Sequence, residues 1–296
     1  MIKKIIHELR YGGIQGLFKR TIRFFPSRFI IKKNKNRPFR YGLNETKREK
    51  RVIVSMTSFK PRFKNICQCL KSLLYQTVKP DRIVVWFGSD VTEDMLSDEM
   101  LDLKQYGIEY RFDDSKNLMP HKKYFYAMQE EPESIVITVD DDAVYSDDMV
   151  SSLLKSYEKN PDCISARRVH KITRNPDGSI ASYRDWKKEY TLTTKPSFDL
   201  MAVGVGGVLY PPHCLYKEAF DVEKIQKYAL RVDDIWLKYM EMLNHVPVVW
   251  VKCSMPHPPS LEGIQSLNSA NVDGDNNDMV IKLLHGIYGD LGGINE

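Results

Sequence analysis

The segment Ser134-Ile-Val-Ile-Thr-Val-Asp-Asp-Asp142 decides the fold. Its first part is an almost uninterrupted run of apolar and β-branched residues, which is typical of a strand buried on both faces of a sheet. Three aspartates follow without a break, and open α/β sheets bind their ligands beyond the carboxyl ends of the strands. Carboxylates this close repel one another unless a cation is present. The segment therefore predicts a central strand that ends at a cation site, and the alternative is a solvated acidic turn.

Strands and helices alternate along the chain on either side of this segment. Further strands are expected at 51–55, 83–87, 108–112 and 246–251, and helices after Pro61 and at 92–105, 120–130, 147–159, 233–243 and 279–288. A Gly-rich, strand-like piece is expected at 203–210, and an antiparallel excursion at 183–190. Strands separated by helices of this length predict βαβ units. The fold class is therefore α/β, with one mixed, mostly parallel sheet in a single domain.

The bulk composition is that of a soluble globular protein, with 42% hydrophobic and 28% charged residues among 296. The five cysteines are odd in number and scattered, which argues against a disulfide framework or a zinc site and favours reduced thiols in the cytosol. No run of about 20 apolar residues is present, so no membrane span is expected. Charged residues interrupt the start of the chain, so a signal peptide is not expected either.

The charge is distributed unevenly along the chain. Residues 1–50 hold 15 Lys and Arg against 3 acidic residues, a net charge of +12, which leaves −7 for the rest of a chain whose total is +5. Apolar residues are interleaved with these cations: Phe18, Phe24, Phe25, Phe29, Ile30 and Ile31. We therefore predict a basic amphipathic extension at 1–48 that binds an anionic membrane surface, followed by a domain at 49–296. A solvated tail or a subunit contact is the alternative, and no motif supports binding to nucleic acid.

Two acidic groups are the candidate site residues. The oxygen ligands of Asp140, Asp141 and Asp142 suit Mg²⁺ or Mn²⁺, which keep waters and bridge to substrate phosphates. Asp233 and Asp234 begin the helix expected at 233–243, where they could cap the helix or act as a general base. The glycines within 204–207 would let the backbone approach a ligand closely, and the alternative is a tight bend in the sheet.

Several of these motifs, taken in order, resemble those of the GT-A glycosyltransferases, in particular bacterial family-2-like enzymes of capsule and lipopolysaccharide synthesis. The resemblance covers about residues 51–251. The matching motifs are Val54-Ser-Met-Thr-Ser58, Arg62, Gln76, Lys122-Lys123-Tyr-Phe125, Asp140-Asp-Asp142, Gly204-Val-Gly-Gly207 and Asp233-Asp-Ile-Trp236. The ordered set is much more specific than the triple aspartate alone.

The resemblance implies a GT-A fold and the transfer of a sugar from a nucleotide-sugar donor, a UDP- or GDP-sugar, to a hydroxyl of a glycan or lipid-linked acceptor. Such an enzyme would work in the cytoplasm, peripheral on the inner face of the cell membrane. It implies donor-site roles for the residues of the first half. Asp142 would be a metal ligand, Asp140 would contact the metal or the nucleotide, and Asp141 would complete the donor site. Thr57 and Ser58 would lie at the base and ribose, and Arg62 and Lys123 would neutralise the diphosphate, unless they are surface cations.

For the second half, the resemblance implies that Asp234, or else Asp233, deprotonates the acceptor hydroxyl, which would invert the anomeric centre. His257 could complete the metal shell, with His285 as the other candidate. An exostosin-like retaining transferase and a non-catalytic binding or scaffold protein on the same fold are the alternatives. A sugar nucleotidyltransferase would need a Gly-rich loop after the first strand, and residues 55–62, SMTSFKPR, contain no glycine.

Overall fold

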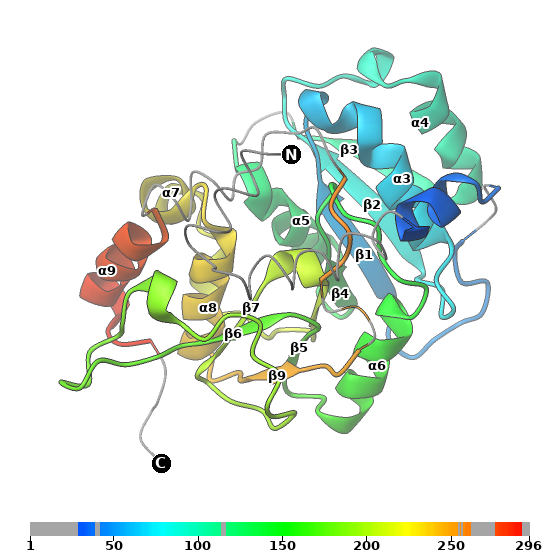
Figure 1. The fold of residues 1–296 in the computed structure, drawn as a ribbon. Coiled ribbons are helices and arrows are strands. Elements are labelled where there is room, and N and C mark those ends of the chain that lie inside the picture. Colours follow the sequence, from blue (N-terminus) through cyan, green and yellow to red (C-terminus); the bar gives the residue numbers. More distant parts are fainter. Residues whose placement is uncertain are drawn as a thin grey trace, which may run out of the picture.

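A seven-stranded mixed sheet forms the centre of the protein (Figure 1). The computed structural model describes residues 29–38, 42–113, 117–253, 255, 257–261 and 276–291. The strand order is β3-β2-β1-β4-β8-β5-β9, in which β8 is antiparallel to both neighbours and the other pairs are parallel. The strands are β1 (Val52–Thr57), β2 (Arg82–Phe87), β3 (Ile108–Phe112), β4 (Ile135–Thr138), β5 (Ile164–Ala166), β8 (Val208–Tyr210) and β9 (Val248–Trp250). The predicted α/β class and mixed sheet are confirmed.

The central strands are apolar throughout because helices cover both faces of the sheet. Alternate residues of β1 point to opposite sides. Val52, Val54 and Met56 pack with α3 (Phe63–Leu74), α4 (Asp98–Asp102) and α6 (Met149–Lys159) in one core. Ile53 packs in another core with Ala127 of α5 (Lys122–Glu130). The parallel strands β1 and β4 therefore end side by side at one edge, which is where the acidic segment emerges.

The helix predicted at 92–105 is broken into three short pieces. These are η2 (Glu93–Met95), α4 and η3 (Leu103–Tyr106). The break lies at Leu96 and Ser97, which have extended backbones, and the Ser97 hydroxyl accepts a hydrogen bond from the Met100 amide to cap a new start. Gly107, with φ of 97°, ends the last piece in the left-handed conformation, which glycine adopts without a steric penalty.

Only the end of the Gly-rich, strand-like piece expected at 203–210 is a strand, β8, and the glycine-containing part is not. The chain runs from β7 (Leu200–Ala202) into a tight turn, η6 (Gly204–Gly206), before β8 begins. Gly206 lies directly against Arg168, so that a Cβ atom there would be 2.6 Å from the Arg168 Cβ. β7 pairs instead with β6 (Val169–Lys171) in a separate two-stranded sheet. The antiparallel excursion expected at 183–190 is limited to η5 (Tyr183–Asp185) and one bridge between Lys171 and Lys187.

The C-terminal helices support the second half of the domain. α8 (Asp233–Leu243) has the predicted bounds, and α7 (Val222–Lys224) precedes it in the chain. A buried ion pair within α8 joins Lys238 Nζ to Glu241 Oε1 at 2.8 Å, and the same ammonium donates to the carbonyl of Leu200 at 2.8 Å. These contacts fix α8 against β7. α9 (Asn276–Tyr288) packs on α8, where the Tyr239 hydroxyl donates to the Ile281 carbonyl at 3.1 Å.

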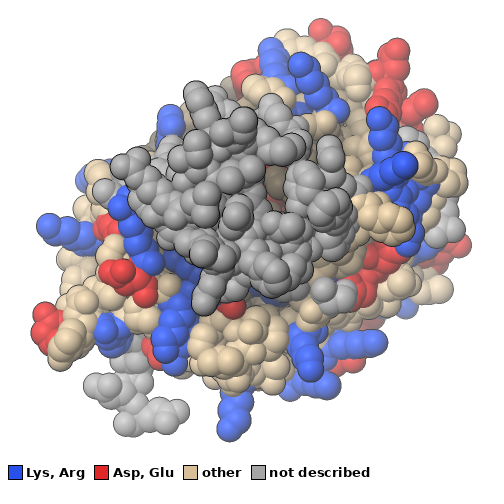
Figure 2. Space-filling view, viewed as in Figure 1, with Lys and Arg blue, Asp and Glu red and all other residues tan. Residues whose placement is uncertain are grey.

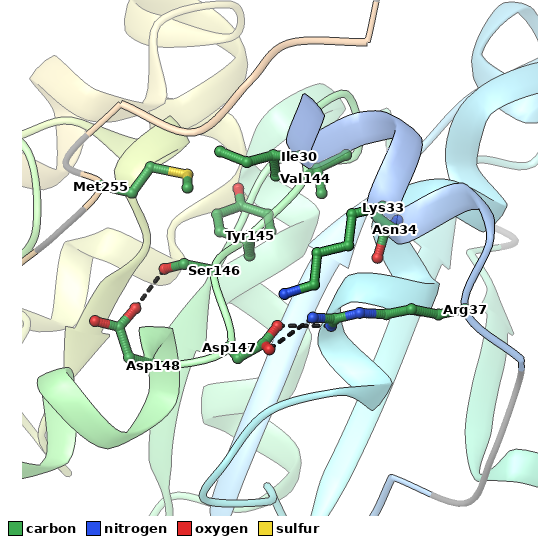
Figure 3. A pocket seen from close by; sticks show the side chains of 10 residues that line it. All are labelled: Ile30, Lys33, Asn34, Arg37, Val144, Tyr145, Ser146, Asp147, Asp148 and Met255. Carbon is green, nitrogen blue, oxygen red and sulfur yellow. Dashed lines mark hydrogen bonds and ion pairs between the residues drawn. The ribbon is translucent and has the colours of Figure 1, made fainter. Parts of the chain in front are cut away.

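The described end of the basic extension is docked on the domain. Residues 29–35 are helical, and Ile30 and Ile31 pack against the core of the first half, whereas Phe29 is 69% exposed. Arg37 forms a bidentate ion pair with Asp147 at 2.7 and 2.8 Å. A cavity of about 300 Å³ lies between this helix and residues 144–148 (Figure 3). Part of the segment predicted to bind a membrane is therefore packed on the protein.

Residues 1–28, with three of the predicted membrane-binding phenylalanines, lie outside the described residues, and the boundary at 48 stays a prediction. Within the described part of the chain, no helix combines the length and the apolar character that crossing a membrane would require.

Candidate active site

Side chains from three distant parts of the sequence converge around Gly204. A Cβ atom at this position would lie 3.0 Å from Lys123 Nζ, 3.2 Å from Asp234 Oδ1 and 3.6 Å from Asp140 Oδ1. Lys123 is in the first turn of α5, Asp140 follows β4, and Asp234 is in the first turn of α8. The missing side chain is therefore what allows both acidic groups predicted from the sequence to approach each other here.

Lys123 joins the two acidic groups. Its Nζ lies 3.0 Å from Asp140 Oδ1 and 2.8 Å from Asp233 Oδ2, and its side chain is only 5% exposed. Burial alone would lower the pKa of this ammonium, but the charges of Asp140, Asp233 and Asp234 raise it well above its ordinary value. The donor-site role predicted for Lys123 stays a prediction, and its ion pair places it at the first residue of the triple aspartate. The contact with Asp233 was not predicted.

Arg62 neutralises the other two aspartates of the triple. Its Nη1 lies 2.9 Å from Asp141 Oδ1 and 2.6 Å from Asp142 Oδ2, with the guanidinium almost completely buried. Burial would lower the pKa of Arg62, whereas Asp141 and Asp142 raise it. The alternative interpretation of Arg62 and Lys123 as surface cations is therefore wrong. Both are buried counter-ions of the acidic segment.

The three aspartates have different surroundings. Asp141 is buried, and this burial raises its pKa to about 7 although Arg62 acts against the shift. Asp140 and Asp142 keep 33% and 19% of their side chains exposed. Burial, and then the charge of Asp140, raise the pKa of Asp142. Asp141 is thus an internal partner of Arg62, while Asp140 and Asp142 offer carboxylate oxygens to the solvent.

These two carboxylates fit a hard divalent cation in ligand type and charge. Mg²⁺ in such sites is held by one or two carboxylates and completed by waters and substrate phosphates. In the described residues, no three His, Cys, Asp or Glu side chains are grouped so that they could hold a metal ion. A cation at Asp142 would compete with the ion pair to Arg62, and it would relieve the repulsion between Asp140 and Asp142.

The two histidines predicted as candidate metal ligands lie in different parts of the structure. His257 is exposed, although it begins a segment that runs beside the acidic residues, where the Leu261 amide donates to the Asp142 carbonyl at 2.7 Å. His285 is in α9, and its Nδ1 lies 3.8 Å from Asp290 Oδ1. Neither forms a three-ligand group with Asp140 and Asp142 among the residues that the structure describes.

Asp233 and Asp234 have opposite electrostatic environments. Burial acts against Asp233, but the charges of Lys123 and His121 lower its pKa. For Asp234, burial and the adjacent Asp233 raise the pKa to about 8. Pairs of carboxyls whose pKa values are driven apart are a common arrangement for acid and base roles. Asp233 is thus a fixed anion and Asp234 is a carboxyl that exchanges a proton near neutral pH.

The two aspartates do not cap α8 with their side chains. The residue before the helix is Val232, and the Asp234 carboxyl accepts hydrogen bonds from the Gly204 amide, at 3.2 Å to Oδ1 and 3.4 Å to Oδ2. This contact orients the Asp234 carboxyl towards the turn where Lys123 and Asp140 also lie.

Thr57 and Ser58 lie at the end of β1, next to β4. Both are held by β2, on the other side of β1, since the Thr57 hydroxyl and the Ser58 amide donate to the Trp86 carbonyl at 2.9 and 3.2 Å. Their predicted roles at the base and ribose stay predictions.

The sequence did not predict the residues that fix the acidic segment by hydrogen bonds to its backbone. The Tyr145 hydroxyl accepts from the Asp140 amide at 2.8 Å and donates to the Val205 carbonyl at 3.3 Å, which ties the segment to the glycine turn. The Ser72 hydroxyl accepts from the Tyr145 amide at 3.0 Å, and the Cys69 thiol donates to the Asp140 carbonyl at 3.4 Å. Only the closeness of Tyr145 to Asp140 in sequence could have signalled such a role.

Comparison with solved structures finds two nucleotide-binding enzymes among the similar chains. A crystal structure of GalNAc-T7 with UDP, GalNAc and Mn²⁺ has a TM-score of 0.46 and 11% identity over 75% of this chain and 48% of that one, so the chain spans about half of that protein's length. A CMP:2-keto-3-deoxy-manno-octonic acid synthetase complexed with CTP has a TM-score of 0.40 and 8% identity over 81% of this chain and 100% of that one.

A search of curated protein sequences finds no match to the chain. The family model for glycosyl transferase family 2 matches residues 53–207. This span contains Arg62, Lys123 and the triple aspartate, and it ends before Asp233 and Asp234. The seven-stranded, mostly parallel sheet agrees with the GT-A nucleotide-sugar transferase fold that the sequence predicted. Because the match covers more than half of the 296 residues, we conclude that the chain belongs to glycosyl transferase family 2.

Proposed function

We propose that this protein is a divalent-cation-dependent glycosyltransferase. It moves a sugar from a UDP- or GDP-sugar to a hydroxyl of a glycan or lipid-linked acceptor, in the synthesis of a surface polysaccharide of the capsule or lipopolysaccharide type. The observation that carries the proposal is the convergence of Asp140 and the Asp233-Asp234 pair around Gly204, with Lys123 as their shared counter-ion. Membership of the family and the order of the motifs give further support.

On the donor side, Asp140 and Asp142 are the residues that would hold Mn²⁺ or Mg²⁺. A bound cation supplies Lewis-acid stabilisation of the diphosphate leaving group. Arg62 stays beside Asp141 and adds a buried positive charge behind the diphosphate. Thr57 and Ser58, at the end of β1, are placed for the nucleoside. His257 is retained as a proposed third ligand because its segment runs along Asp142.

On the acceptor side, Asp234 would take the proton from the attacking hydroxyl. The hydrogen bonds from Gly204 orient its carboxyl, and its raised pKa makes it basic enough to accept a proton once it is ionised. Lys123 keeps Asp233 ionised, so Asp233 does not compete for that proton. A base at this position corresponds to inversion of the anomeric centre, and a retaining, exostosin-like reaction would not require one. A non-catalytic scaffold would not require the two acidic groups to meet at all.

Changing Asp142 to asparagine tests the donor side. Asp142→Asn keeps the shape and removes one anionic ligand, so we expect Mn²⁺-dependent binding of UDP and GDP to be lost while the thermal midpoint stays near that of the wild type. Isothermal titration calorimetry measures the binding. Asp94→Asn, an exposed acid on η2, is the matched control and should bind as the wild type does. Equal affinities in Asp142→Asn and the wild type would show that the donor site is assigned wrongly.

Changing Asp234 to asparagine separates chemistry from binding. We expect turnover to fall by about 10²-fold or more with little change in donor affinity, as for the loss of a general base. In the wild type, turnover should rise with pH through about 8 as Asp234 ionises. Steady-state kinetics of Asp234→Asn and Asp233→Asn between pH 6 and 9.5 are the measurement. Full turnover in Asp234→Asn contradicts the assignment, and a loss confined to Asp233→Asn moves the base to that residue.

The stability of the same variant has a predicted sign. The folded protein holds a proton on Asp234 that the unfolded chain releases above about pH 4, so the wild type loses stability as pH rises towards 8. Asparagine carries no charge at any of these pH values. Asp234→Asn should therefore melt at a higher temperature than the wild type at pH 8, with a much smaller difference at pH 5.

We further propose that residues 1–28, which carry 7 Lys and Arg against 1 acidic residue, hold the enzyme at an anionic membrane surface. Each such cation near the surface contributes roughly 1 kcal/mol. In the described part of the face shown in Figure 2, Lys and Arg are interspersed with Asp and Glu. This part of the face therefore offers no continuous positive surface that could bind the membrane instead of residues 1–28. The docked helix at 29–35 is left intact by a truncation at Phe29.

Vesicle co-sedimentation tests the membrane proposal. The full chain should pellet with vesicles that contain phosphatidylglycerol and stay in the supernatant with phosphatidylcholine alone. The chain that starts at Phe29 should stay in the supernatant with both. Equal pelleting of the two chains would place the attachment elsewhere in the protein.

A further inference from the structure

A cluster of aromatic and basic side chains lies beside β6. Arg168 directly precedes this strand, and Tyr183, Trp186 and Lys188 lie in the connection from β6 to β7. The Tyr183 and Trp186 rings are 5.1 Å apart, and both side chains are largely buried. Lys188 Nζ lies 3.2 Å from the centre of the Tyr183 ring and donates to the Tyr183 carbonyl at 2.5 Å. The cluster therefore holds an ammonium against an aromatic face, an arrangement with favourable cation–π attraction.

This cluster borders the candidate active site. The Arg168 carbonyl accepts from the Val203 amide at 3.0 Å, and Gly206 packs directly on Arg168. The turn between these two residues contains Gly204, whose amide donates to Asp234. Burial raises the pKa of Tyr183, and the charge of Asp234 adds to this shift. Arg168 thus packs on the turn whose Gly204 amide holds the Asp234 carboxyl.

Positive charge is concentrated at this point. Arg168 contacts Glu189 at 3.5 Å. Lys188 is exposed as a residue, but its ammonium is packed on Tyr183. This packing, together with the charge of Arg168, lowers the Lys188 pKa to about 7, although Asp278 and Asp185 act in the other direction. Arg168 and Lys188 thus repel each other, and a bound anion would relieve this repulsion.

The positive charges of Arg168 and Lys188 also act on the buried side chain of His170. The Nδ1 atom of His170 accepts from the Glu189 amide at 3.2 Å, so the neutral ring carries its hydrogen on Nε2. Burial lowers the His170 pKa to about 3, and both Lys188 and Arg168 lower it further, whereas Glu189 opposes the shift. The positive charges outweigh the negative ones at the position of this ring.

The backbone is strained at Glu189, the residue after Lys188. Glu189 has φ of 50°, which is the left-handed region that residues other than glycine seldom adopt. Hydrogen bonds on both sides hold it, from the Tyr190 amide to the Val169 carbonyl and between Lys171 and Lys187 in both directions. Strain that the surrounding structure maintains is a frequent property of ligand-binding positions.

We propose that Arg168 and Lys188 bind a phosphate or carboxylate group of the sugar acceptor, with Tyr183 holding the Lys188 ammonium in place, so that the enzyme selects anionic acceptors. The inference rests on the proposed function, because it places the acceptor hydroxyl at Asp234. A guanidinium and an ammonium together suit either anion, and Arg168 packs on the turn whose Gly204 amide donates to the Asp234 carboxyl.

The test is calorimetric binding of three sugar probes to the full chain: glucose 6-phosphate, glucuronate and glucose. We expect one or both charged sugars to bind at least 10-fold more tightly than glucose. Lys188→Met should remove most of this preference, Lys188→Arg should keep it, and Lys187→Met, the exposed neighbour, should behave as the wild type. The stronger of the two charged probes identifies the anion as phosphate or carboxylate.

Two results would overturn the proposal. One is equal affinity of the wild type for charged and neutral sugars, including the absence of binding by all three. The other is a Lys188→Met variant that binds as Lys187→Met does but melts at a lower temperature, since Lys188 would then serve only to fix the turn at Tyr183. Donor hydrolysis without any acceptor should be measurable in the wild type and unchanged in Lys187→Met. Its absence from the wild type would contradict the proposed function without deciding the question of anion binding.

Discussion

The contact of one buried ammonium with two carboxylates is the interaction on which the rest of the site depends. Lys123 lies between Asp140, at the end of the central strand β4, and Asp233, at the start of α8. Charges removed from water are strongly unfavourable unless they are paired, so neither acidic group could occupy this position without the cation. The pairing also connects the end of β4, where the triple aspartate begins, to the start of α8.

The chemistry of the site follows from how this positive charge is shared. Lys123 is closer to Asp233 than to any other carboxylate that it contacts, so the pKa of Asp233 falls while that of Asp234 rises. Arg62 forms ion pairs with Asp141 and Asp142. Asp141 is almost completely buried, whereas Asp140 and Asp142 keep more of their side chains exposed. Two buried cations therefore decide which of five aspartates are fixed anions, which face the solvent and which exchanges a proton.

Much of this architecture could be predicted from short-range pattern. The β-branched run before Asp140 became β4, and the acidic start of α8 fell at Asp233, because both signals are local and strong. Local signals misled where a tertiary contact decided the outcome. The turn at 204–206 replaces part of the expected strand because Gly206 packs on Arg168, and the Ser97 cap divides the segment 92–105, which was predicted as one helix. The ion pairs of Arg62 and Lys123 join residues 79 and 110 positions apart, which no single sequence reveals.

The central claim is that the two acidic groups form one cation-dependent transferase site, and release of nucleoside diphosphate tests it most directly. The wild-type protein would be incubated with a panel of UDP- and GDP-sugars, with Mn²⁺ or with EDTA, and free UDP or GDP would be quantified by chromatography. We predict release from at least one donor with Mn²⁺ and its loss with EDTA. No release from any donor, or equal release in EDTA, would contradict the account.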